Sequence, residues 1–506
     1  MPPAWRSTSE AQRQVRGSAA DGSARRRAAS PQCAGGCEIV SEIGPSAEGA
    51  EVVLPVAATA TPSLRKNFAA RALSDAYGLV AGLIAATLTA RLLGPSGRGF
   101  YASLMLIALL LIQLYSAGLG EAATVLPGRG ETTLAVAVSS SLALLAPLGA
   151  AAAATFYLSS ALILRPSGGG QLLAISLGAL LVMLNVYSNT LAGFLTAREK
   201  LVVLAGVIGA STTVTTAALF ALLTATPLGV AGAVLASVIG AVIALSLSIV
   251  ALWKEQISLK PRLNRPYVRR AVRFGSAIVF SNLLVQMTGR LDLLLAYRIA
   301  GRASAGMYSI ALTVGTLVGA IPLAIAFASF PRLPKLSDEE AEELTARLFR
   351  VGVVTAVLTG ILLAVASPLV IPRLFGFRFE GAVLPTLLIL PGGVFWSGQW
   401  LLSRAAAARG VTRPLSTSFA VSFLLMVAMD LVLIPAFGIV GAAAASSTAS
   451  LAGFAVAAAY ARRMGCSLRT LVPRGSDLHA MAQSGRSLAS SLITLGRASR
   501  IRPGNE

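Results

Sequence analysis

The sequence predicts an all-α membrane protein with about twelve transmembrane helices in two six-helix lobes, which form a parallel pseudo-two-fold repeat around a central cavity. Three observations support this prediction. The chain is 55% hydrophobic, only 12% charged and has a mean hydropathy of +0.75, whereas about a quarter of the residues of soluble domains are charged. Apolar runs of the length needed to cross a bilayer, ~20 residues, recur along the chain. The second half also repeats residues of the first half in a fixed register.

Twelve apolar runs, each bounded by Arg, Lys, Pro or Gly, are expected to span the membrane. In chain order they cover 73–93, 100–126, 133–157, 171–194, 200–223, 228–253, 273–298, 304–330, 348–371, 382–405, 415–437 and 439–461. The boundary at Gly438 is the tightest of these. Membrane lipid is therefore the medium that surrounds most of the chain.

The basic residues predict the orientation, because Lys and Arg accumulate in cytoplasmic loops. With both termini in the cytoplasm, 24 basic residues flank the spans on that side and 8 lie on the other. The net charge of +21 is thus explained by membrane topology, and no nucleic-acid partner is expected. We expect a multi-pass protein of the cytoplasmic membrane with both ends inside.

An internal repeat divides the spans into two sets of six. Because six is an even number, the two halves enter the membrane in the same direction, as in transporters with parallel repeats around a central cavity. The matched pairs at an offset of 207 are Ser74 with Ser281, Gly82 with Gly289, Arg91 with Arg298, Gly94 with Gly301, Gly99 with Gly306, and Tyr101 with Tyr308. Near the ends of the halves, Gly229, Gly232 and Ser237 match Gly438, Gly441 and Ser446 at an offset of 209.

The expected organisation has five parts. Residues 1–64 form a disordered cytoplasmic tail, 65–253 the N-terminal lobe, 254–272 a basic cytoplasmic linker, 273–463 the C-terminal lobe, and 464–506 a tail with a possible amphipathic helix. Cys33 and Cys37 are interpreted as unpaired thiols, because a zinc site would need two further ligands that the tail does not supply. No metal site and no cofactor are expected.

Several short motifs resemble a known family. The run from Ala90 to Tyr101, Ala-Arg-Leu-Leu-Gly-Pro-Ser-Gly-Arg-Gly-Phe-Tyr, follows the first span and resembles a segment of polysaccharide-transport proteins. Gly289-Arg-Leu-Asp292, Gly306-Met-Tyr308 and Phe330-Pro-Arg332 resemble the second half of the same family. Over about 66–463 the chain is similar to lipid-linked oligosaccharide flippases, which are relatives of lipid II flippases and of multidrug and toxic compound extruders.

The resemblance implies two lobes that rock between inward-open and outward-open states around a central cavity. It also implies a polyprenyl-diphosphate-linked glycan as cargo and the cytoplasmic membrane of a bacterium as location. Monomeric function is expected because each chain contains both lobes. Association with enzymes of polysaccharide assembly is a further expectation.

Arg290 is the leading candidate for contact with the cargo. Asn282, Gln286 and Arg290 recur at i, i+4 and i+8 of the seventh span, so a continuous helix would place them in one polar stripe. A guanidinium binds phosphate oxygens bidentately and stays charged, which suits a diphosphate. The alternatives are that Arg290 extends to the interface or pairs with an acid of another helix. Arg91 and Arg298 are further candidates to reach the diphosphate.

Four acidic residues lie in or next to spans, where an ionisable side chain costs at least ~2.5 kcal/mol. We expect Asp292 to form a structural ion pair with a residue other than Arg290, with ion coupling as the alternative. Asp75, one helical turn after Arg71, is expected to form a local pair. Glu121 and Asp430 either bind a coupling cation or proton or pair with an Arg; the sequence does not choose between these roles.

The residues favour a transporter over an enzyme. No Lys follows a Gly anywhere in the chain, so a Walker-type ATPase motif is absent, and the driving force is expected to be an ion gradient, the membrane potential or substrate chemistry. A cation-coupled multidrug exporter is the alternative, kept open by Asp75, Glu121 and Asp430. A membrane-embedded glycosyltransferase or polymerase is disfavoured, because the longest internal connection is basic and cytoplasmic.

Overall fold

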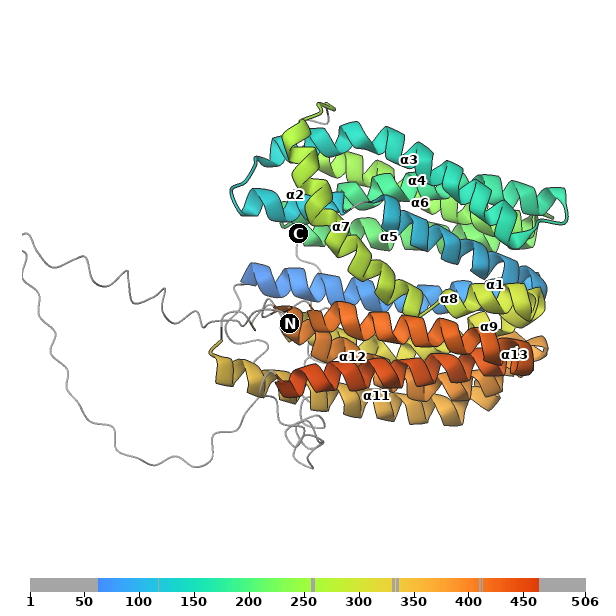
Figure 1. The fold of residues 1–506 in the computed structure, drawn as a ribbon. Helices are drawn as coiled ribbons and strands as arrows, with labels where there is room; N and C mark the ends of the chain where they lie inside the picture. Colours follow the sequence, from blue (N-terminus) through green and yellow to red (C-terminus); the bar gives the residue numbers. More distant parts are fainter. Residues whose placement is uncertain are drawn as a thin grey trace, which may run out of the picture. The chain divides into compact units, whose positions relative to one another are not determined.

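The computed structural model describes residues 62–463, apart from 117, 256–259, 330–332, 334–335, 409–410 and 412. The predicted tails therefore lie outside the described residues, together with Cys33 and Cys37, and so does the side chain of Asp75. Over the described ranges the chain is built from helices that run side by side (Figure 1).

The helices form two sets in chain order. The first lobe contains α1 (Pro62–Tyr115), α2 (Leu119–Gly128), α3 (Leu134–Leu164), α4 (Gly169–Ala197), α5 (Leu201–Ala225) and α6 (Val230–Lys254). The second lobe contains α7 (Arg265–Thr288), α8 (Leu291–Ile299), α9 (Arg302–Gly315), η1 (Thr316–Gly319), α10 (Ala320–Ser329), α11 (Asp338–Phe375), η3 (Phe377–Ala382), α12 (Val383–Ala408) and α13 (Arg413–Arg463).

The number of membrane crossings agrees with the prediction. Among the described residues, 11 helical segments are long and apolar enough to span a bilayer, and the first of them, Ala76–Gly128, has 53 residues. That segment turns at Gly94, where the backbone leaves the helical region (φ 67°, ψ −180°), so it contains two crossings. The prediction of an all-α membrane protein with about twelve spans is confirmed.

The tight turns at one end of the bundle repeat in position between the two lobes. We call this the turn end, and the opposite end, where α1 begins and α13 ends, the loop end. A positive φ occurs in each of the six helix-to-helix turns, at Gly94, Arg165, Gly229, Gly301, Gly376 and Gly438. Gly94 and Gly301 are 207 residues apart, and Gly229 and Gly438 are 209 apart. The repeat found in the sequence therefore recurs in the backbone.

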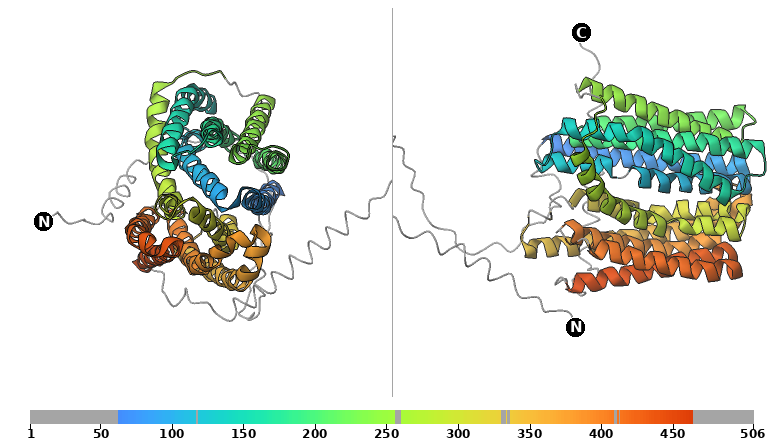
Figure 2. Two further views of the ribbon diagram at one scale, coloured as in Figure 1. Left: turned by 90° about the vertical axis from the view of Figure 1, so that its right-hand side faces the viewer. Right: turned by 45° about the horizontal axis from the view of Figure 1, so that its top comes forward.

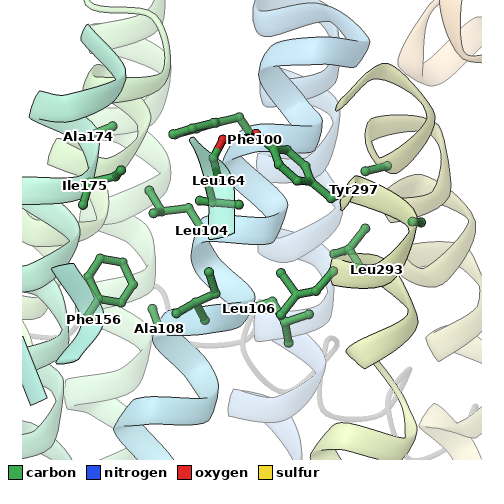
Figure 3. Packing of buried hydrophobic residues seen from close by; sticks show 14 of the residues in the cluster. Phe100, Leu104, Leu106, Ala108, Phe156, Leu164, Ala174, Ile175, Leu293 and Tyr297 are labelled. Carbon is green, nitrogen blue, oxygen red and sulfur yellow. Dashed lines mark hydrogen bonds between the residues drawn. The ribbon is translucent and has the colours of Figure 1, made fainter. Parts of the chain in front are cut away.

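At the turn end the two lobes share one apolar core. Phe100 and Leu104 of α1 pack in the same buried cluster as Phe156 of α3 and as Leu293 and Tyr297 of α8 (Figure 3). The most extensive contact between the lobes, that of α1 with α9, belongs to this region. The turn end is thus a joint between the lobes.

At the loop end each lobe has its own core. Leu126 and Phe194 belong to a cluster of α2 to α7, while Phe349 and Phe419 belong to a separate cluster of α7 and α10 to α13. The end view of the bundle shows the helices of the two lobes as two groups (Figure 2). The lobes are therefore joined at the turn end and packed separately at the loop end.

Helix α7 connects the two lobes and begins earlier than expected. Asn264 accepts a hydrogen bond from the backbone N–H of Tyr267 at 3.0 Å, and Pro266 occupies the first turn, so a good N-cap starts a helix inside the predicted linker 254–272. Tyr267 is buried in the core of the first lobe, whereas Leu284 belongs to the core of the second. The predicted linker is therefore shortened, and α7 crosses from one lobe to the other.

Candidate functional site

A central cavity of about 560 Å³ lies between the lobes. The first lobe contributes Ser74, Gly78 and Leu79 of α1 and Ile208 of α5, and the second lobe contributes residues of α7, α9, α10, α12 and α13. Most of the lining is apolar. A cavity of this size at the interface of two repeated lobes is a candidate binding site.

Arg290 lines this cavity at a break in the seventh span. Helix α7 ends at Thr288, Gly289 follows, and Arg290 (φ −151°, ψ −13°) precedes α8. Its side chain is exposed to the cavity, and within the described part of the chain no carboxylate lies within 4 Å of it. The central cavity thus contains a guanidinium that forms no salt bridge with a described residue, although it interacts electrostatically with the buried Asp292.

The predicted polar stripe is only partly formed. Gln286 and Arg290 both line the cavity, but Asn282 does not. Gln286 and Arg290 line the cavity from the two sides of the break after Thr288, whereas Asn282 lies one turn earlier on α7, outside the cavity wall. Gly has a low helix propensity, but membrane helices tolerate it, so the sequence alone did not indicate a break at Gly289.

Asp292 follows Arg290 by two residues, interacts with it electrostatically and is not among the residues that line the cavity. Its side chain is fully buried and accepts hydrogen bonds from the Tyr308 hydroxyl at 2.5 Å and from the backbone N–H of Leu293 at 2.8 Å. Among the described residues it has no ion pair, so the predicted structural ion pair is replaced by a bond to Tyr308. The carboxylate also occupies the first turn of α8, where the helix dipole favours negative charge.

Asp430 is the second buried acid of this region. It lies on α13, its side chain is fully buried, and neither carboxylate oxygen has a hydrogen-bond partner among the described residues. Tyr308 interacts electrostatically with both acids, and its hydroxyl lies near Ser446, which lines the central cavity. Asp430 also interacts electrostatically with Asp292, and two interacting buried carboxyl groups cannot both ionise at low cost. The arrangement therefore suits a bound proton or cation next to the cavity.

The sequence did not indicate that Tyr308 binds Asp292. Its signals were the Gly306-Met-Tyr308 motif and its match with Tyr101, whose hydroxyl lies 3.5 Å from that of Ser237. Ser237 matches Ser446 in the repeat, so the Tyr–Ser contact recurs in both lobes. The acids do not recur, because Asp292 corresponds to Ala85 at the same offset.

Glu121 lines a second cavity, of about 460 Å³, inside the first lobe. This cavity is formed by α1, α2, α4, α5 and α6, and its wall shares Ile208 with the central cavity. The Glu121 side chain is exposed to the cavity, and no described basic residue lies within 4 Å of it. The predicted alternative of an ion pair with an Arg is therefore not formed among these residues.

Arg91 and Arg298 do not line either cavity. Arg91 donates to the backbone carbonyls of Arg373 and, at 2.8 Å, Leu374, which are the last turn of α11. Arg298 donates to the carbonyl of Ile163 at 3.1 Å, in the last turn of α3. Cations at helix C-termini satisfy free carbonyls and complement the helix dipole. Both residues close the turn end, and the expectation that they reach a cargo is not supported by their positions.

These two contacts are related by the repeat. Arg91 and Arg298 are 207 residues apart, and α3 and α11 are the third and ninth spans. Each lobe therefore caps the matching helix of the other lobe. Tyr297 and Arg302 add further hydrogen bonds to the end of α3, at 3.1 Å and 2.7 Å to the carbonyls of Leu164 and Arg165.

The lobes approach most closely at Gly99 and Gly306. A Cβ atom at Gly99 would collide with the carbonyl oxygen of Arg302, and a Cβ atom at Gly306 would collide with that of Pro95. Arg302 and Pro95 are themselves 207 residues apart, so the contact is symmetric. Next to it, the buried Arg98 donates to the hydroxyls of Thr89 and Ser309. Together these contacts close the turn end.

The described residues thus form two repeated lobes of membrane-spanning helices, joined at one end, with a cavity between them. The chain matches the model of the family described as "Polysaccharide biosynthesis protein" over residues 88–384, which is more than half of its length. It belongs to that family. No curated protein sequence matches the chain.

Solved structures share the fold. An inward-facing multidrug resistance transporter of the MATE family and MOP superfamily superposes with a TM-score of 0.64 at 13% identity, covering 77% of this chain and 94% of the other. The lipid II flippase MurJ in an inward closed conformation gives 0.64 at 12% identity, covering 86% and 93%. A MOP superfamily transporter from Pyrococcus furiosus gives 0.54 at 12%, covering 83% and 99%. The two-lobe fold predicted from the family resemblance is confirmed.

Proposed function

We propose that the protein flips a polyprenyl-diphosphate-linked oligosaccharide, a precursor of a cell-surface polysaccharide, across a bacterial cytoplasmic membrane by alternating access. The observation that carries this proposal is the guanidinium of Arg290 in the central cavity, which forms no salt bridge with a described residue. A diphosphate supplies the anionic oxygens that such a group binds bidentately. The family of polysaccharide biosynthesis proteins, to which the chain belongs, supports the same class of cargo.

The closed turn end and the separate loop-end cores support an inward-facing state. With both termini in the cytoplasm, as the basic residues predict, the loop end faces the cytoplasm, where such glycolipids are assembled. Cargo enters the central cavity from that side. Breaking the contacts of Arg91, Arg298, Gly99 and Gly306 opens the turn end and releases the cargo to the outer leaflet.

Asp292 and Asp430 supply the coupling to an ion gradient. Protonation or cation binding removes the repulsion between two buried carboxyl groups, and the Tyr308–Ser446 contact connects the pair to the wall of the cavity. Asp430 is the better group to titrate, because both its oxygens are free while Asp292 is held by Tyr308. We expect Asp430→Asn to keep glycolipid binding and to lose the dependence of flux on the proton or sodium gradient, measured in proteoliposomes.

The main alternative is a cation-coupled multidrug exporter. Glu121 in the first-lobe cavity supports this alternative, because a lone carboxylate attracts cationic compounds. Arg290 in the central cavity argues against it, because it repels them. An enzyme of the glycosyltransferase or polymerase class is not proposed. We propose a monomer that works beside enzymes of polysaccharide assembly, with no cofactor.

The deciding experiment compares lipids and drugs in cells depleted of the protein. A probe that labels only outward-facing headgroups measures how much polyprenyl-diphosphate sugar reaches the outer leaflet, and dye efflux is measured in the same cells. The proposal predicts accumulation of glycolipid in the inner leaflet with unchanged efflux. Normal lipid exposure with lost efflux would identify a drug exporter instead.

A further inference from the structure

The first lobe contains a cavity that the proposed transport cycle does not yet use. It measures about 460 Å³, within the range of roughly 300–1,000 Å³ that small-molecule sites occupy. Because Ile208 belongs to the walls of both cavities, this cavity is a direct neighbour of the one that holds Arg290. The two cavities therefore lie on opposite sides of a shared wall residue, close enough for one extended ligand to occupy both.

The wall of the first-lobe cavity differs in chemistry from that of the central cavity. Most of its lining side chains are amides or hydroxyls, Glu121 is its one carboxylate, and no Lys or Arg occurs among the described lining residues. The central cavity has mostly apolar walls and one cation. A wall without cations disfavours a phosphate, and many neutral hydrogen-bonding groups favour a neutral polar ligand.

Several of these polar groups have no partner in the protein. The side chains of Gln113, Asn189, Ser188 and Glu121 form no hydrogen bond with a described residue; those of Asn189 and Glu121 are exposed and the other two are partly buried. Ser248 is only 1% exposed, and its hydroxyl has no partner among the described residues. The first four side chains are thus free to bind a ligand or water, and the Ser248 hydroxyl is unpaired where buried polar groups are normally paired.

Other hydroxyls in the same wall are already used. Ser116, Thr124 and Ser211 each donate to a backbone carbonyl three or four residues earlier in their own segment, at 2.6 Å, 3.0 Å and 3.0 Å. The unpartnered groups are therefore a subset rather than a general property of polar residues in this lobe. Gln113 and Asn189 carry amides, which donate and accept at the same time.

The repeat shows that the polarity is specific to the first lobe. In the register that aligns Gly99 with Gly306, Gln113 corresponds to Ala320 and Ser116 corresponds to Leu323. Ala320 and Leu323 both line the central cavity. The same positions of the fold are thus polar in one cavity and apolar in the other.

We propose that the first-lobe cavity is the subsite for the uncharged sugar residues of the cargo, while Arg290 binds the diphosphate. This inference rests on the proposed function. Vicinal hydroxyl groups of a sugar pair with amides and carboxylates, because each hydroxyl both donates and accepts. Glu121 accepts from hydroxyls and excludes the anionic part of the cargo by repulsion, which fixes the direction in which the glycolipid binds.

The experiment measures binding of two lipids by the full-length protein in nanodiscs. The probes are undecaprenyl diphosphate and the same lipid carrying a neutral disaccharide. The variant Gln113→Met/Asn189→Leu preserves side-chain size and removes the amides. We expect it to bind the disaccharide lipid at least about tenfold more weakly, as the loss of two or more hydrogen bonds implies, and to bind the bare lipid unchanged.

Two controls accompany this variant. Ser211→Ala changes a residue of the same wall whose hydroxyl is already bonded to the carbonyl of Ile208, so both affinities should stay within about twofold. The single variants Gln113→Met and Asn189→Leu should each give part of the loss for the disaccharide lipid. Retained binding of the bare lipid demonstrates that the variants are folded.

The outcomes separate the subsite from the proposed function. If the double variant binds both lipids like the parent chain, while Arg290→Ala loses both, the sugar subsite is wrong and the flippase proposal stands. If the parent chain binds neither lipid but binds tetraphenylphosphonium, and Glu121→Gln abolishes that binding, the cavity is a cation site and both proposals fail.

Discussion

The two lobes have the same frame but different interiors. At the turn end they use matched residues: Gly99 lies opposite Gly306, and Arg91 and Arg298 each donate to the end of a helix of the other lobe. Inside, the first lobe has a polar cavity, while the second lobe contributes Arg290 and the buried acids. The contacts that close the turn end thus occur in both lobes, whereas the groups proposed to bind cargo or ions differ between them.

This difference has a physical cause. Contacts that lie on a two-fold axis involve the same surface of both partners, so they can be optimised only together. A cargo with an anionic and a neutral part has no such symmetry and needs different groups on the two sides. Asp292 and Asp430 correspond to Ala85 and Ala221 of the first lobe, which places the acidic pair on one side only.

The largest effect is expected at Arg290, which has no counterpart among the lining residues of the first-lobe cavity. Arg290→Ala removes the only cation that lines the central cavity among the described residues and with it charge-assisted bonds worth about 1.5–3 kcal/mol each. Transport of glycolipid into the outer leaflet should fall about 100-fold or more, with normal protein abundance in the membrane. Arg290→Lys should restore part of the flux. Normal flux in Arg290→Ala would show that Arg290 does not bind the cargo and that the lobes do not differ in this way.

The next effect concerns the contact that the lobes share. Gly306→Ala and Gly99→Ala place a Cβ atom against a backbone carbonyl of the other lobe, and overpacking of this kind costs about 3 kcal/mol. Both variants should shift the population toward states with an open turn end. A cysteine placed at the exposed Leu92 should then react faster with a membrane-impermeant maleimide. Equal acceleration is expected for the two variants, and an effect of only one would contradict the symmetry of the joint.

The sequence predicted the frame well because the frame depends on periodic and local features. Apolar length gave the twelve spans, and the offset of 207 gave the repeat, including the turns at Gly94 and Gly301. The turn at Gly438 was also placed correctly. These features are set by residues close to each other in the chain, and by the length that a bilayer requires.

The site was predicted less completely because it depends on residues far apart in the chain. Arg290 and Gln286 do line the cavity, but Arg91 and Arg298 bind the ends of helices more than 130 residues away. The sequence has no sign of such pairing. The break after Thr288 and the bond of Tyr308 to Asp292 were missed for the same reason, since neither leaves a periodic pattern.

Matched tyrosines provide a more sensitive comparison of the interiors. Tyr308→Phe removes the hydroxyl that Asp292 accepts from and leaves a buried carboxyl group with one donor fewer, which should destabilise the protein by about 2 kcal/mol. Tyr101→Phe removes only a 3.5 Å contact with Ser237 and should change the stability by less than about 0.5 kcal/mol. Thermal unfolding in detergent measures both. Similar losses of stability in the two variants would show that the bond of Tyr308 to Asp292 does not make the two lobes differ in stability.

The smallest effect is expected at the paired helix caps. Arg91 and Arg298 are exposed and each donates to carbonyls at the end of a helix of the other lobe, so each cap is worth only about 0.3–1 kcal/mol. Arg91→Ala and Arg298→Ala should each raise maleimide labelling at the turn end by about two- to fivefold.

The double variant should equal the product of the two single effects, because the caps act on separate helices. The neighbouring Arg302 still binds the end of α3, so the effect of Arg298→Ala should be the weaker of the two. A larger effect of Arg298→Ala than of Arg91→Ala would mean that the end of α3 depends on Arg298 alone. The two lobes would then contribute unequally to the turn end, although the residues are matched.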